Sequence, residues 1–150
     1  MLFQSAPYGI SVSFEGNGVF ARHLFVANHI TDLISYVRSR PYRFPAKIDF
    51  VFASLGNIPN QDQMEYLRKR FPKAKLELLF GGDMVDRITS CSVALWFNQK
   101  RCTFSYRNGH IQFRFKGMVF SIAEGDFSLN RFERFTKLRL GARVHRLPII

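Results

Sequence analysis

The chain has 150 residues, enough for one domain with a sizeable core. Its 22 Lys and Arg residues outnumber its 11 Asp and Glu residues, which gives a formal net charge of +11 at pH 7. No apolar run approaches the roughly 18 residues that cross a bilayer, and the first residues lack a basic segment followed by an apolar one. We therefore expect a cytoplasmic protein without a secretory signal and without a membrane partner.

The positive charge is concentrated in the last third of the chain. Residues 1–90 contain 11 basic and 8 acidic side chains, a net charge of +3, whereas residues 91–150 contain 11 basic and 3 acidic ones, a net charge of +8. A cationic surface suits a polyanionic partner, which in the cytoplasm is most often nucleic acid. The composition predicts nucleic-acid binding, with a basic but inert surface as the alternative.

The first predicted element is an N-terminal β-hairpin. Residues 8–14 alternate apolar and polar side chains like a half-exposed strand, and Asn17-Gly18 suits a tight turn before a return through Val19-Phe20. A central strand is expected over 24–27. We expect the hairpin to cover one edge of the sheet to which that strand belongs.

A helix is expected next, over about 29–39, because Pro41 disfavours a helical conformation for the residue before it. The segment at its end combines basic and aromatic side chains, including Tyr42 and Phe44. Such a segment can hold phosphates and stack a base, although a solvated loop needs no function. Its candidate nucleic-acid-binding residues are Arg38, Arg40 and Arg43.

Two more strand-to-helix units follow. An apolar strand is expected over 48–53, and Asn60 with Gln63 three residues later forms the capping-box pattern that begins a helix. After a third strand over 76–80, Gly81-Gly82 permits a tight exit into a short helix over 83–89. Strand-to-helix alternation repeated three times predicts an α/β fold in which helices pack on a parallel sheet.

From residue 90 the pattern changes to antiparallel strands. A strand is expected over 93–97, and two alternating segments flank Asn108-Gly109, the strongest hairpin signal in the chain. Further expected elements are a strand over 118–123, a helix over 128–140 capped by Ser128 and followed by Gly141, and a strand over 143–150. We therefore expect an α/β core over 1–90 and a basic β-rich extension over 91–150 packed on it.

Alternation in the hairpin separates a face to be buried from a basic face. The apolar face consists of Cys102, Phe104, Tyr106, Ile111, Phe113 and Phe115. Three cations lie on the other face, and three more recur at three-residue spacing on the following helix, whose Leu129, Phe132 and Phe135 are expected to face inward. Such cations can contact successive phosphates. The nucleic-acid-binding candidates of this region are Arg107, Arg114, Lys116, Arg131, Arg134 and Lys137.

Other candidate sites are weaker. Gly81-Gly82 before a helix start can cradle a phosphate with backbone N–H groups, but it lacks the Lys-Ser/Thr pair of a P-loop, so a plain tight turn is the alternative. The four histidines are scattered along the chain, and we expect them to be surface or loop residues rather than metal ligands.

Three stretches in the middle of the chain form an ordered set. They are Asn28 with the following Ile30-Thr31-Asp32-Leu33-Ile34-Ser35-Tyr36, then Ser54-Leu55-Gly56, then Phe80-Gly81-Gly82-Asp83-Met84-Val85-Asp86-Arg87. In this order and spacing they resemble the Toprim domain, in particular the Toprim-like domains of bacterial mobile-element and primase-related proteins. The resemblance covers about residues 22–90 and implies a Toprim-like, Rossmann-like parallel sheet core.

The resemblance also implies a degenerate active site. Toprim domains cleave or join phosphodiesters with a glutamate as the acid/base and with clustered carboxylates that hold Mg²⁺. Here the glutamate position is Asn28, the first aspartate position is Gly81, and only the second is kept, as Asp83. An amide exchanges no proton near neutral pH, so we assign no catalytic residue and no cofactor. If Mg²⁺ binds at all, Asp83 and Asp86 are its expected ligands.

The resulting expectation is a catalytically degenerate, nucleic-acid-binding protein that acts as an accessory factor in DNA processing or mobile-element transfer. Its expected partners are DNA and a larger DNA-processing protein. One alternative is an active Mg²⁺-dependent nuclease or primase-type enzyme with a rearranged site made by Asp32, Asp83 and Asp86. The other alternative is a protein–protein interaction module whose Phe-rich surface docks a larger enzyme.

Overall fold

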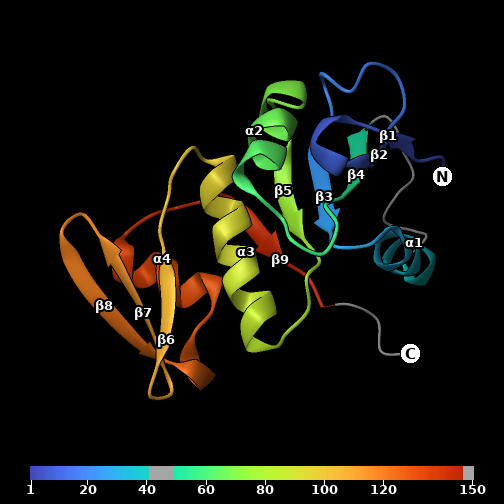
Figure 1. Ribbon diagram of the computed structural model, residues 1–150. Coiled ribbons are helices and arrows are strands. Elements are labelled where there is room, and N and C mark those ends of the chain that lie inside the picture. Colours follow the sequence, from blue (N-terminus) through green and yellow to red (C-terminus); the bar gives the residue numbers. More distant parts are fainter. Residues whose placement is uncertain (41–48, 147–150) are drawn as a thin grey trace.

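A computed structural model describes residues 1–40 and 49–146 of the chain (Figure 1). Six strands form the main sheet in the order β1-β2-β4-β3-β5-β9. The neighbours β4-β3-β5-β9 run parallel, and β2 and β1 extend the β4 edge in antiparallel fashion. The strands are β1 (Gln4–Ser5), β2 (Ser11–Ser13), β3 (His23–Ala27), β4 (Phe50–Ser54), β5 (Lys75–Leu78) and β9 (Ala142–Val144). The expected α/β class with a mostly parallel sheet is confirmed.

Three helices cover the two faces of this sheet. Alternate strand residues point to opposite sides: Phe25 packs with Tyr36 of α1 on one side, and Leu24 joins Met64 of α2 and Cys91 of α3 in the larger core on the other. These three helices are α1 (Ile30–Ser39), α2 (Gln61–Arg70) and α3 (Met84–Phe97), and a fourth helix, α4 (Leu129–Thr136), lies outside this sheet. None of the helices in the described ranges is long and apolar enough to cross a bilayer.

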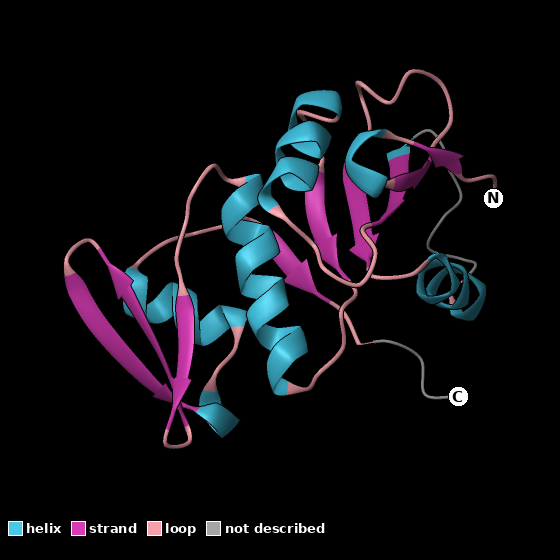
Figure 2. Cartoon of the chain, viewed as in Figure 1, coloured by secondary structure: helices cyan, strands magenta, loops and turns pink. Residues whose placement is uncertain are grey.

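Helix α3 corrects the sequence-based interpretation. It continues for 14 residues, so the short helix ending at 89 and the separate strand over 93–97 are both wrong. A short apolar run such as 93–97 fits a buried strand and a buried helix equally well. Here both sides of the helical segment 93–97 are packed, because α3 lies between the main sheet and a second, three-stranded sheet (Figure 2). The expected boundary between residues 90 and 91 falls inside this helix.

The expected N-terminal hairpin is wrong: of the strand expected over 8–14 only residues 11–13 form β2, and β2 pairs with a strand before it instead of one after it. β1 pairs with β2, with Gln4 opposite Val12, and the chain turns through the 3-10 segment Pro7–Gly9. The expected return strand at Val19-Phe20 is wrong, because residues 15–20 form successive turns. The side-chain oxygen of Asn17 accepts a hydrogen bond from the N–H of Val19 at 3.0 Å, which stabilises a local turn instead of a strand.

The second sheet consists of β6 (Phe104–Arg107), β7 (His110–Phe115) and β8 (Met118–Ala123). The hairpin about Asn108-Gly109 is confirmed: both residues have positive φ, 51° and 78°, as a type I′ turn requires. The strand expected over 118–123 is confirmed as well. Tyr106, expected to be buried, is 54% exposed and instead donates a hydrogen bond to Glu124 at the surface.

Helix α4 packs on the inner face of this second sheet and is shorter than expected. Ser128 caps it as predicted, by accepting a hydrogen bond from the N–H of Arg131 at 3.1 Å. It ends at Thr136 rather than 140, because Lys137 adopts a left-handed conformation with φ 65°. Phe132 is fully buried, whereas Phe135 is 43% exposed and not inward as expected. Of the terminal strand expected over 143–150, β9 covers 142–144, and residues 147–150 lie outside the described range.

Candidate functional site

Asn28 lies directly after β3, at the edge of the sheet where the Toprim resemblance places an acid/base. Its side-chain amide donates to the carbonyl oxygen of Gly56 at 2.9 Å, and the N–H of Gly56 donates to the carbonyl oxygen of Asn28 at the same distance. The two bonds join the segments that leave β3 and β4. A carboxylate has no N–H to donate to Gly56, so the amide has a structural role that glutamate cannot fill.

Gly81 follows β5, where the Toprim resemblance would place the first aspartate. Its φ is +103°, a conformation that residues with side chains rarely adopt. A Cβ atom at this position would lie 2.5 Å from Oδ2 of Asp86, too close for any side chain unless Asp86 moves. Glycine at this position therefore has a steric reason in this fold.

Asp83 and Asp86 cap the start of α3 together. Asp83 Oδ1 accepts from the N–H of Asp86 at 2.8 Å, and Asp86 Oδ2 accepts from the N–H of Asp83 at 3.3 Å. Burial raises the pKa of Asp86 above its ordinary value, and the nearby charges of Asp83 and Asp32 add to this effect. Over residues 1–40 and 49–146, no three His, Cys, Asp or Glu side chains gather as metal ligands. The two aspartates thus serve the helix start.

The two adjacent glycines give a direct test of this arrangement. We expect Gly81→Ala to lower the free energy of unfolding by about 1–3 kcal/mol, because the alanine would combine an unfavourable φ with a contact that disrupts the Asp83–Asp86 cap. Gly82→Ala is the matched control. Its φ lies outside the left-handed region and its Cβ would meet nothing within 4 Å, so the change should be neutral or slightly stabilising. Urea denaturation measures both; equal effects would contradict the steric explanation.

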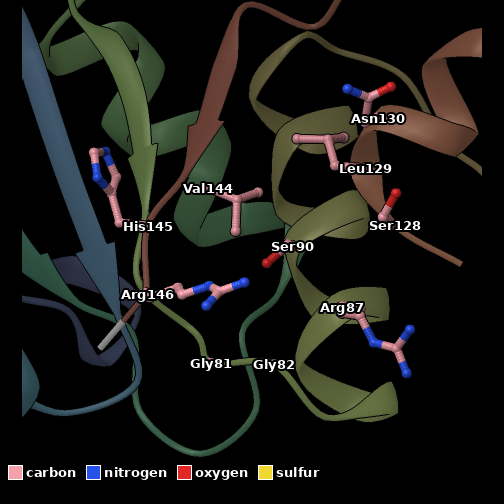
Figure 3. Close-up of a pocket in the computed structure, with 10 residues that line it drawn as sticks. All are labelled: Gly81, Gly82, Arg87, Ser90, Ser128, Leu129, Asn130, Val144, His145 and Arg146. Carbon is pink, nitrogen blue, oxygen red and sulfur yellow. The ribbon is translucent and has the colours of Figure 1, made fainter. Parts of the chain in front are cut away.

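A groove of about 550 Å³ lies at the carboxyl ends of β5 and β9 (Figure 3). Residues after β9, including Arg146, line one side, and residues 128–130 at the start of α4 line the other. Arg87 and Ser90 of α3 and the Gly81-Gly82 turn complete its lining. In an open α/β sheet this edge is where ligands bind.

Arg87 holds two sides of the groove together. Its Nη1 donates to the carbonyl oxygens of Glu124 and Phe127 at 3.0 and 2.8 Å, and its Nε donates to the carbonyl oxygen of Asp83 at 3.2 Å. These bonds tie the segment before α4 to the first turn of α3. The sequence places Arg87 within the Toprim-like stretch but gives no indication that it bridges to residues 37 and 40 positions away.

Behind β9 lies a buried polar network that sequence reasoning missed. Glu77 of β5 is only 3% exposed and lies 3.2 Å from Nε2 of His145 and 3.4 Å from Nδ1 of His23. His145 also contacts the Tyr36 hydroxyl at 2.9 Å through Nδ1. Figure 3 shows the His145 ring on the far side of β9 from Ser90. His145 lies in the loop after β9, in line with the expectation of a surface or loop position, but its side chain is only 10% exposed. The available signal for this network was an acidic residue inside an apolar strand.

The predicted nucleic-acid-binding cations lie in three separate places. Arg107 and Arg114 project from the outer face of the second sheet, and Lys116 follows in the next turn; we call these three the sheet triad. The helix triad consists of Arg131, Arg134 and Lys137. Because α4 packs its buried side on the inner face of that sheet, the two triads lie on opposite sides of this layer.

The remaining cations lie near the end of α1, on another part of the molecule. Arg38 is exposed, Arg40 places its guanidinium 4.4 Å from the centre of the Tyr36 ring, and Arg43 lies outside the described residues. All members of the sheet and helix triads are exposed, and none forms an ion pair with a carboxylate in the described part of the chain. The structure thus leaves both triads available to an anionic partner.

Comparison of the chain with protein-family models, with curated proteins and with solved structures finds no match. Three features of the chain itself bear on its function: the capped and carboxylate-poor strand ends, the groove beside α3, and the two cationic triads.

Proposed function

We propose that the protein is a nucleic-acid-binding, catalytically degenerate Toprim-like protein that serves as an accessory factor in DNA processing or mobile-element transfer. The observation that carries the binding proposal is the sheet triad: three exposed cations on one antiparallel sheet, without a carboxylate partner among the described residues. Exposed cations without a carboxylate partner can bind the phosphate backbone, and each such contact releases a counterion, which favours binding.

The spacing on this face suits a nucleic-acid strand. Arg107 is paired with His110, which lies four residues before Arg114 in β7. The backbone positions of the two arginines are therefore about 13 Å apart along the strand direction. Phosphates of one strand of duplex DNA follow each other every ~3.4 Å along the axis, so both arginines can contact the same backbone. Ser105 and Gln112 face each other between them and supply neutral hydrogen-bonding groups.

The Toprim-like part of the proposal rests on the order of the strand-to-helix units and on what stands at the strand ends. Asn28 follows β3 and Gly81 follows β5, two parallel neighbours. The Asn28 amide donates to Gly56, which a carboxylate cannot do, and a Cβ atom at Gly81 would lie 2.5 Å from Asp86. Asp83 and Asp86, which the enzyme alternative requires as Mg²⁺ ligands, are engaged with each other's backbone N–H groups. These features favour binding over phosphodiester cleavage.

Two charge-reversal variants of equal net charge test the binding proposal. Fluorescence anisotropy with a labelled duplex should show an affinity that falls steeply with salt concentration. Changing the sheet triad to glutamates (R107E, R114E, K116E) should weaken binding by roughly 100-fold or more, since attraction becomes repulsion at each contact. The matched control changes the helix triad instead (R131E, R134E, K137E), and it should retain most of the affinity.

Two outcomes would contradict this assignment. If the sheet-triad variant binds like the wild type, the cationic face has no role in binding. If both variants lose affinity equally, binding follows net charge and not a defined surface. Thermal unfolding followed by circular dichroism confirms that each variant is folded, which is expected because all six side chains are exposed.

A further inference from the structure

We propose that the groove between β9 and α4 binds a phosphate group, presented by a phosphomonoester. The inference goes beyond the proposed function and does not depend on it. The groove is built from α3, the end of β9 and the start of α4, whereas the sheet triad lies on the outer face of the second sheet.

The first observation is an unpartnered hydroxyl. Ser90 is 2% exposed, and its Oγ has no hydrogen-bond partner within residues 1–40 and 49–146. In Figure 3 this oxygen points from α3 toward the side of the groove on which Arg146 lies. A buried hydroxyl without a partner is unfavourable. An oxygen atom of a bound ligand would satisfy it.

The second observation is the start of α4, which lines the opposite side of the groove. Ser128 precedes this eight-residue helix, and its hydroxyl oxygen accepts a hydrogen bond from the N–H of Arg131 at 3.1 Å. The N–H groups of Leu129 and Asn130 belong to the first turn, which has no intrahelical acceptors. Together with the positive end of the helix dipole they favour an anion. Asn130 is among the residues that line the groove.

The third observation is the sign of the charge. The charged side chains that line the groove include Arg87 and Arg146, and no acidic residue of the described ranges lines it. Arg87 is fixed by three backbone carbonyls, so its positive charge stays in place. Arg146 is exposed and makes no ion pair with a carboxylate that the structure describes, so its planar group is available for bidentate contact with a phosphate.

The size of the groove indicates what carries the phosphate. Its volume of about 550 Å³ is within the range of small-ligand sites and far exceeds a single phosphate ion. Space therefore remains for a sugar or a similar group attached to the phosphate. A free nucleotide and the 5′-phosphate end of a nucleic-acid strand share this chemistry, and titration distinguishes them.

Amide chemical shifts provide the readout. We expect inorganic phosphate, a nucleoside 5′-monophosphate and a 5′-phosphorylated tetranucleotide to shift the amides of Gly82, Ser90 and Asn130, whereas a 5′-hydroxyl tetranucleotide should not. Equal affinity of the nucleotide and the phosphorylated strand would identify a free nucleotide as the source. Roughly tenfold tighter binding of the strand would identify a strand end. If no phosphate compound shifts these amides, the proposal is wrong.

Three variants complete the test. Arg146→Gln and Ser90→Ala should each weaken binding of the phosphate compounds, the arginine change by roughly 10–100-fold. Arg101→Gln removes an exposed arginine beyond the other end of α3, whose last residue, Phe97, lies about 10 Å from Ser90 along the helix axis, and should have no effect. Unchanged affinity in Arg146→Gln would overturn the assignment. A long duplex with 5′-hydroxyl ends measures binding to the sheet triad without a terminal phosphate. The proposed nucleic-acid binding and the proposed phosphate site can therefore each be disproved independently of the other.

Discussion

Replacing Phe132 with alanine is expected to lower the free energy of unfolding by about 3–5 kcal/mol. The ring is fully buried, and its centre lies 4.9 Å from that of Phe113 and 5.6 Å from that of Phe104. These contacts hold α4 against the second sheet, so the change would leave a cavity at the centre of that layer. Guanidinium denaturation should show a lower midpoint with an unchanged slope.

Phe135→Ala is the matched control, because it makes the same substitution at another position of the same helix. Phe135 is 43% exposed and meets Phe120 only by an edge contact at 6.1 Å, so its removal should cost about 1 kcal/mol or less. Similar losses for both variants would show that α4 does not depend on Phe132.

The same experiment bears on domain organisation. One apolar core runs from Leu24 in the main sheet through Cys91 in α3 to Phe132 in α4. We therefore expect a single cooperative transition for Phe132→Ala. Two separate transitions would indicate that the second sheet and α4 unfold independently of the main sheet, as two structural units would.

Local signals determined which elements sequence reasoning found. Asn60 with Gln63 forms the predicted capping box, and Asn108-Gly109 the predicted turn, because a few neighbouring residues decide both structures. The strand expected over 93–97 failed because contacts with distant parts of the chain decide it. α3 carries apolar side chains on both sides, and the second side is buried only when β6–β8 and α4 fold against it.

The candidate site was predictable to a similar degree. The sequence places Asn28, Gly81 and Asp83 at strand ends, but it cannot show that Asp86 occupies the space where a side chain at Gly81 would lie. It indicates exposed cations, yet the opposite orientation of the two triads follows only from the packing of α4. The groove was missed because Ser90, Asn130 and Arg146 come from three distant segments.

Glu77→Ala is expected to cost about 3–5 kcal/mol of stability, because it removes the carboxylate around which a buried network is built. The network has a consistent set of donors. The N–H at Nε2 of His145 donates to the Glu77 carboxylate at 3.2 Å, and Nδ1 of His145 shares a hydrogen bond with the Tyr36 hydroxyl at 2.9 Å. His23 lies within ion-pair distance, 3.4 Å, but its Nδ1 lacks hydrogen-bond geometry. Without Glu77, His145 Nε2 would be buried without an acceptor.

Glu77→Gln separates charge from hydrogen bonding, since its amide oxygen still accepts from His145, and it should cost only about 1–2 kcal/mol. An exposed glutamate changed in the same way, Glu15→Gln, should stay within about 0.5 kcal/mol of the wild type. The backbone N–H of His145 also donates to the carbonyl oxygen of Leu78 at 2.9 Å. His145 is therefore held by its ring and by its backbone, and this fixes the chain next to Arg146. Glu77→Ala should therefore also weaken phosphate binding in the groove. Wild-type stability in Glu77→Ala would show that the network does not hold the end of β9 in place.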